Sequence, residues 1–74
     1  MKGPYEYVGY VVMYYRIKAG LSQKALADRA GCDQADICKI EWGYCNLTIK
    51  KLTKIANAMG KKLLIDFVDP DTVL

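Results

Sequence analysis

Four stretches of the chain place apolar side chains at helical spacing, and each is bounded by residues that start or stop helices. The first stretch, about residues 5–18, follows Pro4, which suits the first turn of a helix, and ends at Gly20. The others cover residues 23–30, 34–41 and 49–59, and each follows a residue that can cap a helix, namely Ser22, Asp33 and Thr48. The pattern therefore predicts four helices joined by short turns.

The predicted core comes from the apolar positions that share one face of each helix. These positions are Val8, Val12 and Tyr15 in the first helix, Leu26, Ala27 and Ala30 in the second, Ile37 and Ile40 in the third, and Ile49, Leu52, Ile55, Ala56 and Met59 in the fourth. The first helix is apolar around most of its remaining circumference too. We therefore expect its second face to be covered by the C-terminal segment or by another subunit.

The C-terminal residues 61–68 alternate instead of following a helical period. Leu63, Ile65 and Phe67 share one side of a predicted short strand, which Pro70 ends. A single strand leaves its backbone groups without partners, and the chain offers no second clear strand. We therefore expect residues 62–68 to pair with the same strand of another subunit in a two-fold dimer.

Composition narrows the function classes. The 74 residues make one domain, and the net charge of +3 permits nucleic acid as a partner without establishing it. No apolar run approaches the roughly 18–20 residues that span a bilayer, and the first residues do not lead into a signal peptide, so the sequence predicts a cytoplasmic protein.

Several kinds of chemistry are not indicated. Cys32, Cys38 and Cys45 lack paired metal-ligand spacing, and the chain has no histidine, so the sequence predicts structural cysteines, no metal site and no cofactor. No nucleophile with an adjacent base, carboxylate pair or phosphate loop is recognisable, so we do not expect an enzyme.

The informative stretch runs from residue 23 to residue 40. Two short helices joined by so few residues must cross steeply, which requires a small residue such as Ala27 at the crossing and a residue that accepts a positive φ, such as Gly31, in the turn. The outward face of the third helix then carries short or polar side chains that can approach base edges in a major groove: Gln34, Ala35, Asp36, Cys38 and Lys39.

These features closely resemble the phage-repressor/Cro (XRE) family of helix-turn-helix domains over about residues 8–60. The matching residues are Gly20-Leu21-Ser22-Gln23, Leu26-Ala27, Gly31, Ile37, Lys39-Ile40-Glu41, Gly43, Leu52, Ile55-Ala56 and Ala58-Met59-Gly60. The resemblance implies that Gln23 holds a phosphate and braces the reading helix, that Gln34 and Ala35 meet base edges, and that Lys39 contacts a base or a phosphate. It also implies backbone contacts from Asn46, Lys50 and Lys51, and a partly buried ion pair between Arg16 and Glu41.

The chain departs from the family pattern at a few positions. Asp33 and Asp36 place two carboxylates at the groove end of the reading helix. Asp33 fits a capping role, whereas Asp36 either accepts a hydrogen bond from a cytosine amino group or weakens the affinity for DNA. Trp42 stands where a polar or basic residue is usual, and Tyr44 and Cys45 lie in a loop that is often basic. Modest affinity per subunit would make dimerisation necessary for useful binding.

The combined expectation is an all-α domain of four helices with a short C-terminal strand. Residues 1–60 form the DNA-binding domain, and residues 61–74 form a dimerising strand and tail through Leu63, Ile65 and Phe67. The expected function is that of a homodimeric, sequence-specific transcriptional repressor that binds double-stranded DNA. Two alternatives stay open: an antitoxin that also binds a toxin, because the C-terminal strand weakly resembles that of some type II antitoxins, and a protein-interaction module that does not bind DNA.

Overall fold

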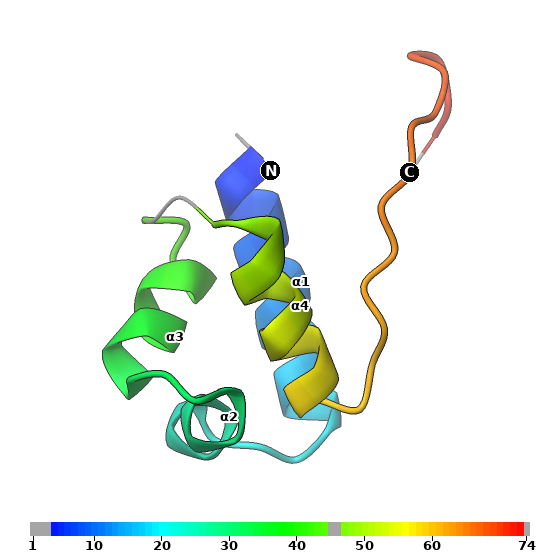
Figure 1. Ribbon diagram of the computed structural model, residues 1–74. Helices are drawn as coiled ribbons and strands as arrows, with labels where there is room; N and C mark the ends of the chain where they lie inside the picture. Colours follow the sequence, from blue (N-terminus) through cyan, green and yellow to red (C-terminus); the bar gives the residue numbers. More distant parts are fainter. Residues whose placement is uncertain (1–3, 45–46, 74) are drawn as a thin grey trace.

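The computed structural model describes residues 4–44 and 47–73, and over these residues the chain forms four helices followed by a segment without regular secondary structure (Figure 1). The helices are α1 (Pro4–Lys18), α2 (Gln23–Ala30), α3 (Gln34–Glu41) and α4 (Ile49–Ala58). The predicted all-α class with four helices is confirmed, and the helix ends differ from the predicted ones by one residue at the start of α1 and at the end of α4.

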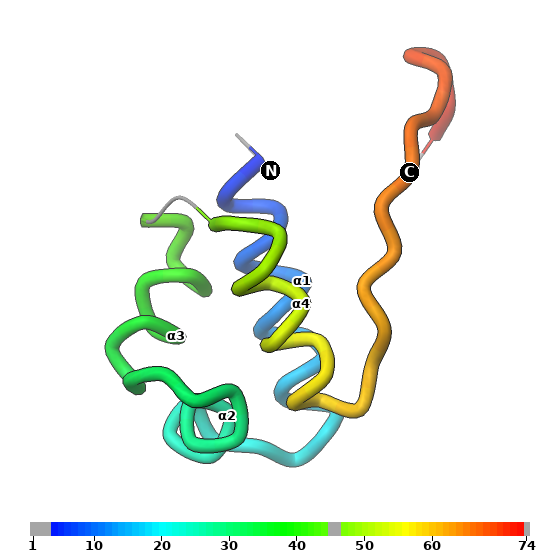
Figure 2. The backbone as a smooth tube through the Cα atoms, in the orientation of Figure 1, coloured from blue at the N-terminus to red at the C-terminus, as the bar shows by residue number. Residues whose placement is uncertain are grey.

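Helix α2 begins at a side-chain cap, and one glycine together with an extended residue makes the sharp corner between α2 and α3. Ser22 accepts a hydrogen bond from the backbone N–H of Ala25 at the start of α2. Gly31 ends that helix with φ +72°, in the left-handed region that glycine enters without a steric penalty. Asp33 has the extended backbone of a capping residue before α3, but its side chain makes no capping hydrogen bond. Two short helices thereby meet at a corner (Figure 2).

A single small core joins all four helices. Its largest fully buried side chains are Val12, Leu26, Ile37, Ile40 and Ile55. Two members of the predicted core are wrong: Tyr15 is 38% exposed and Ile49 is 59% exposed. Ile49 is the first residue of α4 and lies outside the packed turns, and the inner face of α1 is centred on Gly9 and Val12 instead of turning toward Tyr15.

Gly9 lets α1 pass very close to the end of α3. It is buried, and a Cβ atom built on it would lie 2.8 Å from the carbonyl oxygen of Glu41 and closer still to that of Ile40. Both neighbours are backbone atoms at a helix end, so they cannot move aside as a flexible side chain could. The sequence pattern did not reveal this contact, because a glycine within an apolar helix only lowers helix propensity.

The C-terminal segment forms no strand in the described chain, so the predicted strand over residues 62–68 does not form within one subunit. The segment leaves the end of α4 and runs back alongside it, standing off from the helices (Figure 1). The partner expected for this strand was another subunit, so the intersubunit pairing stays a prediction.

None of the helices formed by residues 4–44 and 47–73 is both long enough and apolar enough to cross a membrane.

We predict that Gly9→Ala destabilises the fold by roughly 1–3 kcal/mol, because the added methyl group overpacks the junction of α1 and α3. At an open helical position the same substitution would instead stabilise the helix by about 0.5–1 kcal/mol. Urea unfolding monitored by circular dichroism gives the difference. Gly20→Ala is the control, since Gly20 has φ +72° and nothing within 4 Å of an added Cβ; it isolates backbone strain, worth about 1–2 kcal/mol. A Gly9→Ala variant as stable as the parent would contradict the prediction.

Candidate nucleic-acid interface

Helix α3 is anchored on one side and open on the other. Ile37 and Ile40, three residues apart, are fully buried and fix the helix on the core. Three residues predicted to meet DNA lie on exposed positions of the same helix: Gln34, Ala35 and Lys39. A short helix held through one face presents the other to solvent as a rigid surface, which suits insertion into a DNA groove.

The position of α3 is fixed at its C-terminal end by Arg16 of α1. Its guanidinium donates two hydrogen bonds to the carboxylate of Glu41, from Nε to Oε2 at 2.6 Å and from Nη2 to Oε1 at 3.1 Å. The third nitrogen, Nη1, donates to the backbone carbonyl of Leu21 at 2.8 Å. The two side chains are 14% and 3% exposed, so this bidentate pair is largely shielded from water.

Gln23 joins the same network from the first turn of α2. Its Nε2 donates to Glu41 Oε1 at 3.1 Å, so the amide of Gln23 contacts the last residue of α3. Hydrogen bonding to Glu41 raises the pKa of Arg16 above its ordinary value, which keeps the guanidinium charged. The pair and the amide together join α1, α2 and α3 at one point.

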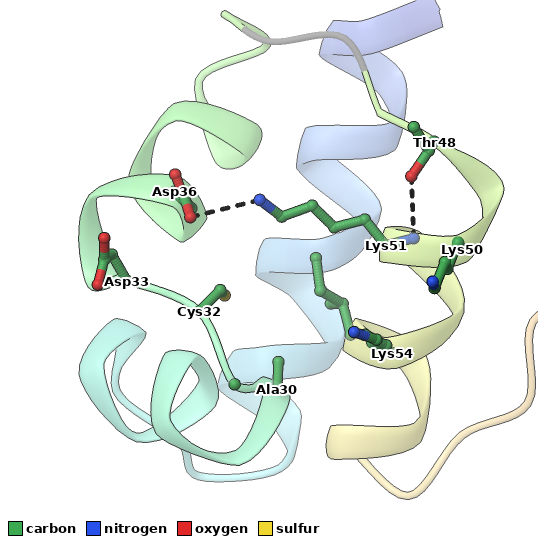
Figure 3. Close-up of a pocket in the computed structure, with 10 residues that line it drawn as sticks. Ala30, Cys32, Asp33, Asp36, Thr48, Lys50, Lys51 and Lys54 are labelled. Carbon is green, nitrogen blue, oxygen red and sulfur yellow. Dashed lines mark hydrogen bonds and ion pairs between the residues drawn. The ribbon is translucent and has the colours of Figure 1, made fainter.

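A hollow of about 440 Å³ separates the start of α3 from α4 (Figure 3). Three lysines of α4 line it, Lys50, Lys51 and Lys54, and Asp33 and Asp36 lie on the opposite side. Lys51 Nζ and Asp36 Oδ2 are 3.3 Å apart and form an ion pair across the hollow, with both side chains 38% exposed. The backbone N–H of Lys51 also donates to the capping hydroxyl of Thr48. Sequence reasoning missed this pair, because no spacing rule links residues on different helices.

The described cysteines are free thiols. Cys32 borders the hollow and Cys38 lies on α3, and both are half-buried. Burial raises the pKa of the Cys32 thiol, the nearby carboxylates of Asp36 and Asp33 raise it further, and the charge of Lys51 lowers it. A thiol with a raised pKa is neutral and unreactive near pH 7, which fits a structural role. Cys45 lies outside the described residues.

The remaining residues predicted to contact DNA are only partly placed. Lys50 is exposed on the first turn of α4, beside the hollow. Asn46 lies outside the described residues, so the structure does not place it. Of the predicted positions, the structure brings Asp36, Lys50 and Lys51 together around the hollow. Gln34, Ala35 and Lys39 are exposed on α3, and Gln23 is half-buried against Glu41.

Two aromatic side chains extend from the end of α3. The rings of Trp42 and Tyr44 stack with centroids 6.4 Å apart, and Trp42 is 65% exposed. Gly43 between them turns with φ +76° and lies against the backbone of Glu6, where an added Cβ would be 3.0 Å from Cα. This contact holds the aromatic pair at the surface beside α1.

The structure also holds an apolar groove of about 670 Å³. It is bordered by α1, α4 and the C-terminal segment, whose residues Leu63, Leu64, Ile65 and Val68 line it. Of the three residues predicted to dimerise, Leu63 is half-buried, Ile65 is 58% exposed and Phe67 is 95% exposed. The C-terminal segment therefore borders the face of α1 that carries Val8, Val12 and Tyr15, and it presents further apolar side chains outward. On the second apolar face of α1, Tyr10, Tyr14 and Ile17 remain 44–60% exposed, so the covering of that face by another subunit stays a prediction.

A family model and several solved structures show which known proteins this chain resembles. A family model described as helix-turn-helix matches residues 12–65. Among solved structures, the restriction-modification controller protein C.AhdI from Aeromonas hydrophila is 28% identical over 77% of this chain and 83% of its own, with a TM-score of 0.75. The wild-type controller protein C.Esp1396I is 32% identical over 77% of this chain and 75% of its own, also with a TM-score of 0.75.

Two further structures extend the comparison. A second structure of C.Esp1396I is a tetramer in complex with its natural 35 base-pair operator. The clp gene regulator ClgR from C. glutamicum shares the fold, with a TM-score of 0.78 at 20% identity over 84% of this chain and 85% of its own. No curated protein matches this chain in sequence.

We predict that Glu41→Gln destabilises the fold by about 3 kcal/mol, because it leaves the shielded guanidinium of Arg16 without its counter-charge. Urea unfolding of the full chain measures the change. Asp28→Asn is the matched control, since it removes a carboxylate from the exposed pair with Lys24, whose side chains are 72% and 67% exposed; such a pair contributes roughly 0–1 kcal/mol. Equal effects of the two substitutions would show that the Arg16–Glu41 pair is not structurally important.

Proposed function

The chain belongs to the XRE-type helix-turn-helix family of DNA-binding transcription regulators, and from this premise we propose that it is a homodimeric repressor that reads its operator with α3. The observation that carries the proposal is that α3 is anchored on the core through Ile37 and Ile40 and leaves its other face exposed. The lysines of α4 lie across the hollow from the start of α3. Two such helices would enter successive major grooves about 34 Å apart. Bound there, the dimer would block access to the promoter.

Base recognition is proposed for the first turns of α3. A glutamine amide such as that of Gln34 can form paired hydrogen bonds with adenine, and a lysine such as Lys39 can donate to the guanine acceptors O6 and N7. Ala35 adds a small apolar contact that suits a thymine methyl group. All three residues are exposed on the same helix, so they can approach the bases without displacing the core.

Phosphate contacts are proposed for the start of α4. Lys50 and Lys51 lie in its first turn, where the helix dipole also favours an anion. Gln23 supports the surface indirectly, because its hydrogen bond to Glu41 braces the end of α3. Such contacts position the protein on DNA without reading its sequence.

Dimerisation is proposed for the C-terminal segment. Ile65 and Phe67 are exposed, and the segment borders an apolar groove between α1 and α4. Covering these side chains removes apolar surface from water, which is the usual driving force for association. Self-association of a relative is recorded in the tetramer of C.Esp1396I on its operator.

A second candidate is a regulator that also binds a partner protein, as an antitoxin binds its toxin. The exposed stack of Trp42 and Tyr44 favours it, because aromatic side chains of this kind are enriched in protein interfaces. The stack lies beside the end of α3, away from the apolar groove lined by the C-terminal segment. DNA binding through α3 is common to both candidates.

We predict that the full chain binds duplex DNA with an affinity that falls steeply with salt, and that Lys50→Ala flattens this dependence. Loss of one phosphate contact lowers the slope of log K against log salt by about 0.9 per subunit. Fluorescence anisotropy on a labelled duplex across a salt series measures the slope. Lys18→Ala, at the exposed C-terminal end of α1, removes the same charge away from α3, α4 and the C-terminal segment and should leave the slope unchanged.

Two results would contradict this prediction. Absence of duplex binding at low salt would reject the proposed function as a whole. Equal slopes for Lys50→Ala and the parent chain would remove Lys50 from the interface while leaving DNA binding in place.

We predict that a chain ending at Gly60 sediments as a monomer at concentrations where the full chain is a dimer. The shortened chain keeps all four helices and the buried core. Phe67→Asp in the full-length chain tests the same surface without shortening it, and should also favour the monomer. Sedimentation of either folded variant as a stable dimer would place the dimer interface elsewhere.

A further inference from the structure

The ion pair between Asp36 and Lys51 joins the reading helix to the helix that is proposed to contact phosphates. Asp36 lies one turn before Ile40 on α3, beside the exposed positions of Gln34 and Ala35. Lys51 reaches it from α4 across the hollow, with 3.3 Å between Nζ and Oδ2 (Figure 3). A carboxylate at the proposed base-reading surface thus neutralises a lysine of the proposed phosphate-binding surface.

Lys51 can exchange the carboxylate of Asp36 for another anion. Both side chains keep more than a third of their surface in contact with water, and ion pairs that are exposed to this degree contribute little to stability. A DNA phosphate offers Lys51 an equivalent partner, and the contact between the lysine and the phosphate releases a counterion from the DNA. Lys51 therefore has two competing anions, one within the protein and one on the ligand.

The exchange leaves Asp36 as an unpaired carboxylate beside DNA. An ionised carboxylate only accepts hydrogen bonds, and the surrounding phosphates repel it. In the major groove the N4 amino group of cytosine is a donor that suits an acidic side chain. A site with cytosine at that position satisfies Asp36, and a site without it leaves the carboxylate unsatisfied.

We propose, on the basis of the proposed function, that Asp36 is a specificity-determining residue. On the preferred site Lys51 moves from Asp36 to a phosphate, and Asp36 accepts a hydrogen bond from a cytosine amino group. On other sequences Lys51 stays with Asp36, so the chain makes one phosphate contact fewer per subunit. Specificity at this position then comes from weakened binding to wrong sequences as well as from a contact with the right one.

The chain offers a matched control for Asp36. Asp33 is a second carboxylate that lines the same hollow, and its side chain makes no capping hydrogen bond. Asp33→Asn therefore removes the same charge from the same region without releasing Lys51. Both variants are compared with the parent by circular dichroism and urea unfolding, and equal midpoints show that any change in binding is not caused by loss of the fold.

The first experiment selects bound duplexes from a random-sequence library with the full parent chain, Asp36→Asn and Asp33→Asn. We expect the parent and Asp33→Asn to prefer cytosine at one position of each half-site, and Asp36→Asn to lose that preference. Replacing this cytosine in the selected duplex should weaken parent binding by about tenfold, as for a single lost base contact. The same replacement should change Asp36→Asn binding by less than about twofold, because a neutral amide both accepts and donates hydrogen bonds and so no longer requires an amino group on the base.

The second experiment measures the salt dependence of binding to a scrambled duplex. Asp36→Asn should steepen the slope by about 0.9 per subunit, because Lys51 is free to contact a phosphate. Asp33→Asn should raise affinity without changing the slope.

The outcomes separate this inference from the function on which it rests. A parent chain that binds no duplex rejects the proposed function. If the parent chain does bind duplex DNA, three results would each overturn only the proposed role of Asp36. The parent chain could select no base at this position, Asp36→Asn could keep the cytosine preference, or both variants could change the slope equally.

Discussion

The guanidinium of Arg16 is the point on which the arrangement of the helices depends. It bonds to Glu41 at the end of α3 and to the carbonyl of Leu21 before α2, and the amide of Gln23 reaches the same carboxylate. Three helices therefore share one shielded charge network, in a domain whose described residues include five large fully buried side chains. So small a core fixes few relative orientations by packing alone, and directional hydrogen bonds between charged groups supply the missing constraint. The angle at which α3 faces solvent follows from this network.

Much of the fold could be predicted from the sequence because its determinants are local. Ser22 and Thr48 cap the helices that they precede, and Gly31 takes the left-handed conformation that the corner requires. Helical spacing identified most of the buried positions, since periodicity along a helix reports directly which face is covered. The network of Arg16 and Glu41 was expected from family resemblance alone, because residues 25 positions apart obey no spacing rule.

The features that escaped prediction all depend on contacts between separate elements. Gly9 is needed where α1 meets backbone carbonyls of α3, which no pattern within α1 reveals. Tyr15 was assigned to the core because it continues a helical period, yet the close approach at Gly9 and the inward position of Arg16 turn it toward the rim. The pairing of Asp36 with Lys51 depends on how α3 and α4 face each other. The alternating pattern of residues 61–68 predicts a strand, but among the residues that the structure describes no other strand forms for it to pair with.

The placement of Trp42 has a practical consequence for studies of this molecule. It is the only tryptophan in the sequence, and it lies on the surface directly after α3, with its ring stacked on Tyr44. An indole in contact with water emits at longer wavelength than one in an apolar setting, so the molecule carries its own optical probe at one defined point. Its emission reports whatever covers the end of α3, with no dye attached and no residue replaced.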